Sequence, residues 1–115
     1  MGTQVVVCDQ EGFDIVAFAP TAIRIEVKAT ARGAVSNNKL EFNTGKGGGK
    51  GRVTEAHCEV VALADLLGMR CLFFPIGKIN RKNFKVSKNR FTPADEAASW
   101  LNCVRKANGK NISNN

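Results

Sequence analysis

The amino-acid sequence predicts one domain of the mixed α/β class, with a central sheet and a C-terminal helix. Two observations lead to this prediction. Short runs of alternating apolar and polar residues follow one another between residues 3 and 30, which is typical of antiparallel strands joined by tight turns. Residues 92–109 have the spacing and the end signals of an amphipathic helix. A chain of 115 residues, 43% of them hydrophobic, is long enough to bury one modest core.

Four short strands are expected in the first half of the chain. The first three are residues 3–9 (TQVVVCD), 13–19 (FDIVAFA) and 22–30 (AIRIEVKAT). Alternate side chains of a strand point to opposite faces, so the third strand turns Ile23, Ile25 and Val27 to the core and its charged residues to the other face. A fourth strand is expected at 39–44 (KLEFNT).

Residues 55–67 are ambiguous by propensity and periodicity. Their Ala, Glu and Leu residues are good helix formers, and Gly68 is suited to end a helix. The run CEVVALA at 58–64 is equally typical of a buried strand, and periodicity does not separate the two structures in a run this short. Residues 72–76 (LFFPI) are expected to form a strand that stops at its proline, after a hairpin turn at 66–69.

The C-terminal helix has the clearest signals. Thr92 supplies an N-cap oxygen and Pro93 takes the first helical position. We expect the helix to end at Asn108-Gly109, which makes residues 1–109 the domain and 110–115 a disordered tail. Its expected apolar stripe, which would pack on the sheet, consists of Ala97, Trp100, Leu101 and Val104.

The chain is basic, and its positive charge is clustered. Seventeen Lys and Arg residues against ten Asp and Glu give a net charge of +7, and residues 78–90, which we expect to form a loop, hold six basic side chains and no acidic one. The glycine-rich segment 45–52 adds three more basic residues. Such clusters fit a polyanion such as DNA or, alternatively, a solubilising surface. The candidate DNA-binding residues are Lys46, Lys50, Arg52, Lys78, Arg81, Lys82 and Lys85.

Several other functions are disfavoured. No apolar run reaches the roughly 18 residues of a membrane helix, and the N-terminus lacks the features of a secretory signal, so we expect a cytoplasmic protein, near the nucleoid or in a phage-infected cell. The four cysteines form no CxxC pair and His57 is the one histidine, which disfavours zinc sites and triad catalysis. The glycine-rich segment does not match a phosphate-binding P-loop.

Three side chains of the second and third strands suggest a metal site. Glu26 and Lys28 lie two positions apart and share one face, and Asp14 opens the preceding strand, so the two carboxylates can converge across the hairpin. Two carboxylates and the carbonyl of Val27 are suitable ligands for Mg²⁺ or Mn²⁺, and an adjacent lysine can act on the attacking water and the phosphate. Glu-x-Lys on a strand is also typical of a solvated row of ion pairs.

The stretch FDIVAFAPTAIRIEVKAT resembles the PD-(D/E)XK nuclease superfamily, whose signature is an Asp on one strand and Glu-x-Lys on the next. The likeness is closest to small homing endonucleases of bacterial and phage group I introns. It extends over about residues 2–107 and includes Phe42-Asn43-Thr44, Phe74-Pro75-Ile76 and Ser99-Trp100.

This resemblance implies a restriction-endonuclease-like mixed sheet, with Asp14 and Glu26 as metal ligands and Lys28 as the catalytic cation. It also favours a strand at residues 57–64. We expect the helix that the family usually carries before its first strand to be missing here.

The resulting expectation is a Mg²⁺-dependent (or Mn²⁺-dependent) DNA endonuclease. One active site cuts one strand, so we expect a homodimer or a higher homo-oligomer. Two alternatives remain open: a non-catalytic nucleic-acid-binding module on the same fold, and a structural protein in which the Glu-x-Lys pattern is accidental.

Overall fold

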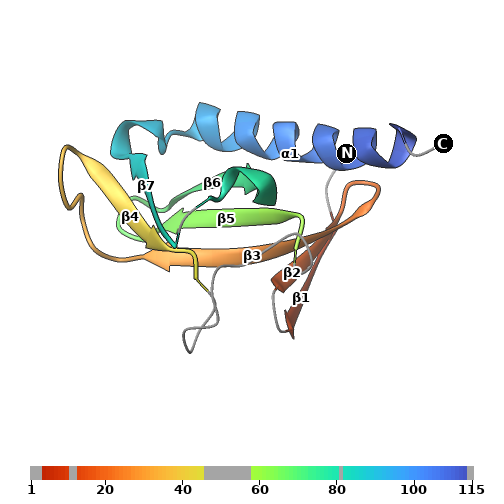
Figure 1. Ribbon diagram of the computed structural model, residues 1–115, viewed down its shortest axis with the longest axis horizontal. Coiled ribbons are helices and arrows are strands. Elements are labelled where there is room, and N and C mark those ends of the chain that lie inside the picture. The colour runs from red at the N-terminus through yellow and green to blue at the C-terminus, as the bar shows by residue number, and fades with distance from the viewer. Residues whose placement is uncertain (1–3, 11–12, 46–57, 81, 114–115) are drawn as a thin grey trace.

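The computed structural model describes residues 4–10, 13–45, 58–80 and 82–113. In these residues the chain forms three layers, namely one helix, a five-stranded sheet and a two-stranded sheet (Figure 1). The larger sheet has the order β1-β2-β3-β5-β6, and the smaller one pairs β4 with β7. The strands are β1 (Gln4–Gln10), β2 (Phe13–Phe18), β3 (Ala22–Thr30), β4 (Lys39–Asn43), β5 (Val60–Asp65), β6 (Arg70–Pro75) and β7 (Asn83–Ser87), and the helix is α1 (Pro93–Ser113).

The first three strands form the expected antiparallel meander. Val6 pairs with Val16 across β1 and β2, and Ile15 pairs with Ile25 across β2 and β3. β3 has the predicted bounds, because its alternating residues fit a sheet that is covered by different layers on its two faces. The mixed α/β class with a C-terminal helix is therefore confirmed.

β5 resolves the ambiguous segment as a strand. It runs parallel to β3, with Val27 opposite Ala62 and Lys28 opposite Leu63, and antiparallel to β6. Nearly all of its side chains are buried, because both faces of the sheet are covered at this position. A central strand of this kind reads as a continuous apolar run, so burial overrides the helix propensity of its Ala and Leu residues. Gly68 lies in the following turn, where an added Cβ would stand 2.6 Å from the Asp65 carboxylate.

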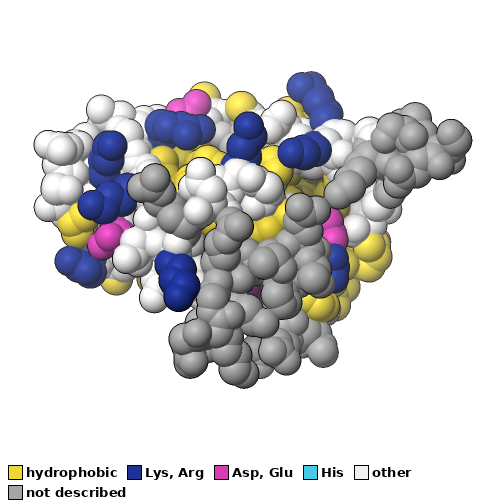
Figure 2. All heavy atoms as spheres, viewed as in Figure 1, with side chains coloured by type: hydrophobic (Ala, Val, Ile, Leu, Met, Phe, Trp, Pro, Cys, Tyr) yellow, Lys and Arg dark blue, Asp and Glu magenta, His cyan; other side chains and the backbone are white. Residues whose placement is uncertain are grey.

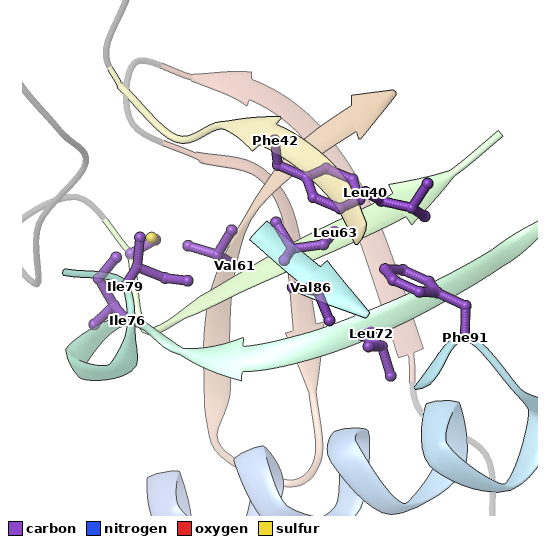
Figure 3. Close-up of a cluster of buried hydrophobic side chains, with 10 residues drawn as sticks. Leu40, Phe42, Val61, Leu63, Leu72, Ile76, Ile79, Val86 and Phe91 are labelled. Carbon is purple, nitrogen blue, oxygen red and sulfur yellow. The ribbon is translucent and has the colours of Figure 1, made fainter. Parts of the chain in front are cut away.

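The two faces of the larger sheet carry separate cores. On one face, α1 packs Trp100, Cys103, Val104 and Ala107 against side chains of β2, β3 and β5. On the other face, the small sheet inserts Leu40, Phe42 and Val86 onto Val61, Leu63 and Leu72 (Figure 3). β5 thus lies between two apolar layers, whereas β3 is covered by α1 on one face and carries its charged residues on the other.

The apolar stripe of α1 is rotated from the predicted one. Leu101 is 50% exposed, whereas Cys103, which the prediction left out, is buried. The observed stripe keeps the predicted i, i+3, i+4, i+7 spacing but starts at Trp100. The predicted core role of Trp100 is confirmed by its contact with Phe73, at 5.1 Å between ring centres.

The end of α1 also differs from the prediction. The helix continues through Asn108-Gly109 to Ser113, so it does not end where the sequence predicted. Asn108 is held inside the helix because its Nδ2 donates a hydrogen bond to the Ala19 carbonyl at 3.0 Å, in the turn between β2 and β3. Within the described residues, no helix is both long and apolar enough to cross a membrane.

Residues 78–90 were expected to form a basic loop, and this expectation was wrong. Their central part is β7, which pairs with β4 so that Phe42 lies opposite Phe84 and Leu40 opposite Val86. The alternation of Phe84 and Val86 with polar residues fits a strand with one buried face, a pattern that the charge of the segment obscured.

α1 also covers the free edge of β6. Glu96 Oε1 accepts a hydrogen bond from the Cys71 backbone N–H at 2.8 Å, and Ser99 Oγ accepts one from the Phe73 N–H at 3.1 Å. These N–H groups belong to alternate residues and point away from β5. Glu96 and Ser99 are three residues apart on one helix face, so α1 both packs on the sheet and satisfies its edge.

We expect Glu96→Ala to lower the free energy of unfolding by about 1 to 2 kcal/mol, because it leaves the Cys71 N–H without its acceptor. Glu96→Gln keeps an acceptor oxygen and is expected to lose less than half as much. Urea unfolding followed by circular dichroism measures both variants. Equal losses for the two would contradict the role of Glu96 as an edge cap.

Candidate active site

The three residues Asp14, Glu26 and Lys28 lie together on the face of the larger sheet opposite α1. Glu26 and Lys28 pair with Val61 and Leu63 of β5, whose side chains face the small sheet. Asp14 lies one position beyond the Ile15–Ile25 pair, so the same register places it opposite Glu26. The structure therefore brings together all three residues that the sequence singled out.

Asp14 is fixed by the backbone of β3. Its Oδ2 accepts a hydrogen bond from the Val27 N–H at 2.9 Å, and its carboxyl group is also hydrogen-bonded to that of Glu26. The N–H and C=O groups of one strand residue point to the same side, so the Val27 carbonyl is directed toward β2 as well. Two carboxyl groups and one carbonyl thus converge at the start of β2.

The surroundings of Glu26 favour its neutral form. Burial, followed by the hydrogen bond and the negative charge of Asp14, raises the pKa of Glu26 to about 7, while Lys28 acts in the opposite direction. The Glu26 side chain is only 14% exposed. A divalent cation would relieve this crowding of carboxyl groups, because it stabilises both charged forms at once.

Lys28 is held between Glu26 and the end of β4. Its Nζ lies 3.5 Å from Glu26 Oε2 and donates a hydrogen bond to the Gly45 carbonyl at 3.2 Å. Gly45 is placed in turn by Asn43, whose Oδ1 accepts from the Gly45 N–H at 2.9 Å. With its side chain 22% exposed, Lys28 is an ordered, half-buried cation, which distinguishes this row from a solvated one.

These residues fit a hard divalent cation. Carboxylate and carbonyl oxygens are the ligands that Mg²⁺ and Mn²⁺ prefer, and Asp14, Glu26 and Val27 supply them. Among the described residues, no group of three or more His, Cys, Asp or Glu side chains could hold a metal ion. Any site at this position consequently needs the backbone carbonyl and water to complete its coordination.

The cysteines of the described residues are structural. Cys58, Cys71 and Cys103 carry free thiols, and burial raises their pKa values to about 12, 11 and 12 respectively. A thiol that stays protonated at neutral pH is a poor nucleophile. His57 and the side chain of Cys8 lie outside the part of the chain that the structure describes.

The described basic residues of segment 78–90 lie on and beside the small sheet. Lys78, Lys82 and Lys85 are exposed, and Lys85 lies on the outer face of β7 opposite Glu41. The Lys82 carbonyl accepts hydrogen bonds from the backbone N–H and the hydroxyl of Thr44, the residue before Gly45, so this basic segment borders the site of Lys28. Figure 2 shows Lys and Arg side chains over the small sheet and along α1. Lys46, Lys50, Arg52 and Arg81 fall outside the described residues.

Sequence reasoning missed one pair of charged residues beside the site. Arg24 occupies the same row of β3 as Glu26, and it forms an ion pair with Glu59 at the start of β5. The spacing of Arg24, two residues before Glu26, was a usable signal. Glu59 gave none, because it is 35 residues away in the chain and only the parallel pairing brings it close.

Comparisons with known proteins found similarity at the level of the fold. No model of a known protein family matches the chain, and no curated protein matches it. Among solved structures, the chain is similar to a bacterial homing endonuclease, I-Ssp6803I, with a TM-score of 0.66 and 12% sequence identity over 98% of this chain and 84% of that one. At this identity the likeness concerns the fold alone and not the catalytic motif.

We expect the Glu26 carboxyl to titrate near pH 7 in metal-free protein. Asp14→Asn should lower this pKa because it removes a neighbouring negative charge, and Lys28→Met should raise it because it removes a positive one. Side-chain carbon NMR of isotope-labelled protein in EDTA measures the shifts. Shifts in the same direction for both variants would contradict the described geometry.

Glu26→Gln is expected to stabilise the protein at pH 8 and to have little effect at pH 4. The folded-state pKa of Glu26 lies above its ordinary value of 4.5, so the folded protein loses stability as pH rises through about 7. A glutamine avoids this loss, which is on the order of 1 kcal/mol after allowance for coupling and screening. Urea unfolding at both pH values, with EDTA present, gives the difference.

Proposed function

We propose that this protein is a metal-dependent DNA endonuclease of the PD-(D/E)XK type that hydrolyses phosphodiester bonds. One observation carries the proposal: Asp14, Glu26 and Lys28 meet on two adjoining strands, in a fold similar to that of an endonuclease. The composition of the site supports this chemistry, because oxygen ligands stand directly beside a cation.

In this proposal, Asp14 and Glu26 bind Mg²⁺ together with the Val27 carbonyl. If an ion were bound by these residues, it would supply Lewis acidity toward the phosphate and toward water. Lys28 places an ammonium group beside the same point, where it orients the attacking water and stabilises the charge that develops on the phosphate oxygens. The Gly45 carbonyl fixes the direction of Lys28 and thereby reduces the reorganisation needed during the reaction.

DNA is proposed to lie along the basic side of the small sheet, with Lys78, Lys82 and Lys85 on its phosphates. Such contacts position the duplex without reading its sequence. The natural assembly is proposed to contain at least two copies, because each site cuts one strand. An apolar groove of about 450 Å³ between β1, β2 and α1, lined by Val5, Ile25 and Trp100 among others, offers surface for such assembly.

Lys28→Ala and Asp14→Asn are expected to lower the nicking of supercoiled plasmid in Mg²⁺ by at least about a thousandfold, because one removes the proposed catalytic cation and the other a proposed metal ligand. In EDTA, the affinity of both variants for DNA should stay within about threefold of that of the unmodified protein, since the basic surface is unchanged. Gel assays measure both properties.

Lys85→Ala is the matched control, since it removes one exposed lysine away from the site. It should weaken DNA retention slightly and leave the nicking rate at saturating DNA unchanged. If the unmodified protein binds DNA in a salt-dependent manner but cuts no DNA form with Mg²⁺ or Mn²⁺, the second candidate function, a non-catalytic DNA-binding module, replaces the first.

A further inference from the structure

Arg24 stands beside the candidate active site, in the same row of β3. It precedes Glu26 by two residues, so the two side chains leave the strand on the same face with Cα atoms about 7 Å apart. The guanidinium carbon lies 6.0 Å from the ring centre of Phe13, which is the residue before Asp14. The Arg24 side chain is 35% exposed, so part of the group faces solvent next to the site.

Glu59 fixes the direction of this guanidinium. Its carboxylate accepts hydrogen bonds from Arg24 Nε at 3.2 and 2.9 Å, and from Nη2 as well. The same carboxylate accepts from the Arg24 backbone N–H at 2.7 Å, and the Glu59 N–H donates to the Arg24 carbonyl at 3.0 Å. An arginine held in this way has already lost much of its rotamer entropy, so it loses less on binding a ligand.

We propose that Arg24 binds a phosphate of the DNA strand next to the one at the metal site, and that Glu59 is a positioning residue that keeps the guanidinium turned toward that phosphate. This inference rests on the proposed nuclease function. The step of about 7 Å from Glu26 to Arg24 is longer than the axial rise of about 3.4 Å between successive phosphates of one strand, so Arg24 contacts a phosphate within about two nucleotides of the scissile one and not the scissile phosphate itself. The planar guanidinium suits this ligand because it can donate two parallel hydrogen bonds to phosphate oxygens.

The chain offers a matched control in the pair Arg70 and Glu96. It is also an arginine–glutamate pair, with 40% and 33% of the side chains exposed against 35% and 36% for Arg24 and Glu59. Arg70 lies on the far edge strand β6 and Glu96 on α1, and their closest charged atoms are farther apart, at 3.8 Å. Arg70→Gln therefore removes an equal charge from a comparably exposed site that the proposal leaves out.

The experiment measures the affinity for duplex DNA in EDTA over a range of salt concentrations, and the cleavage of the same DNA in Mg²⁺. Arg24→Gln should reduce the slope of log affinity against log salt by about 1, since one phosphate contact is lost, while Arg70→Gln leaves it unchanged. Arg24→Lys keeps the charge and should restore the slope, but it should leave kcat at least tenfold low because lysine lacks the planar fork.

Glu59→Gln tests the positioning role. It keeps the charge of Arg24, so the salt slope should stay normal while kcat falls about tenfold. If its melting temperature drops and kcat per folded molecule is unchanged, Glu59 is structural only and its assigned role is wrong. Equal slope changes in the Arg24 and Arg70 variants overturn the phosphate contact.

The two proposals fail in different ways. If the unmodified protein cuts DNA and the Arg24→Gln variant has the same salt slope and the same kcat, this inference is wrong and the nuclease function stands. An unmodified protein that binds DNA and does not cut it removes the nuclease function, and the salt slopes then still decide whether Arg24 binds a phosphate. An unmodified protein without DNA affinity overturns both.

Discussion

The parallel pairing of β3 with β5 is the constraint on which the rest of the structure depends. It places β3 inside the sheet, with β2 on one side and β5 on the other. The charged row of β3 therefore cannot turn freely into solvent, and each of its members finds a partner across the sheet. Asp14 of β2 is hydrogen-bonded to the Val27 N–H beside Glu26. Glu59, just before β5, is hydrogen-bonded to Arg24. Gly45, just after β4, accepts a hydrogen bond from Lys28.

Ionisation of Glu26 at this site lowers the free energy of unfolding of the protein. Two carboxyl groups share a hydrogen bond in a half-buried position, where ionisation of Glu26 is unfavourable. Lys28 offsets part of this cost, and the two apolar cores on either side of the sheet supply the stability that keeps the groups together. Such crowding of like charges is typical of cation-binding sites, because the bound ion neutralises the negative charge of the carboxylates.

The two sheets divide the proposed work. The larger sheet holds the proposed catalytic groups on β2 and β3, which are paired with neighbouring strands, and exposed lysines on and beside the small sheet suit contact with a phosphate backbone. Thr44 donates hydrogen bonds to the Lys82 carbonyl. The next residue, Gly45, accepts one from Lys28. The basic segment therefore lies next to the site of Lys28. In the proposed function, these few residues of backbone would couple contact with DNA to the chemistry at the site.

The sequence by itself determined the features that depend on local periodicity. These are the bounds of β3, the start of α1 at Thr92-Pro93, and the common face of Glu26 and Lys28. Tertiary structure alone decided what depends on burial by distant elements. It made residues 60–65 a strand against their propensity, turned the α1 stripe from Leu101 to Cys103, extended the helix past Gly109, and joined Glu59 to Arg24. The physical reason is that covering a strand on both faces and pairing charges across a sheet require residues that are far apart in the chain, and no local pattern records which distant residues will meet.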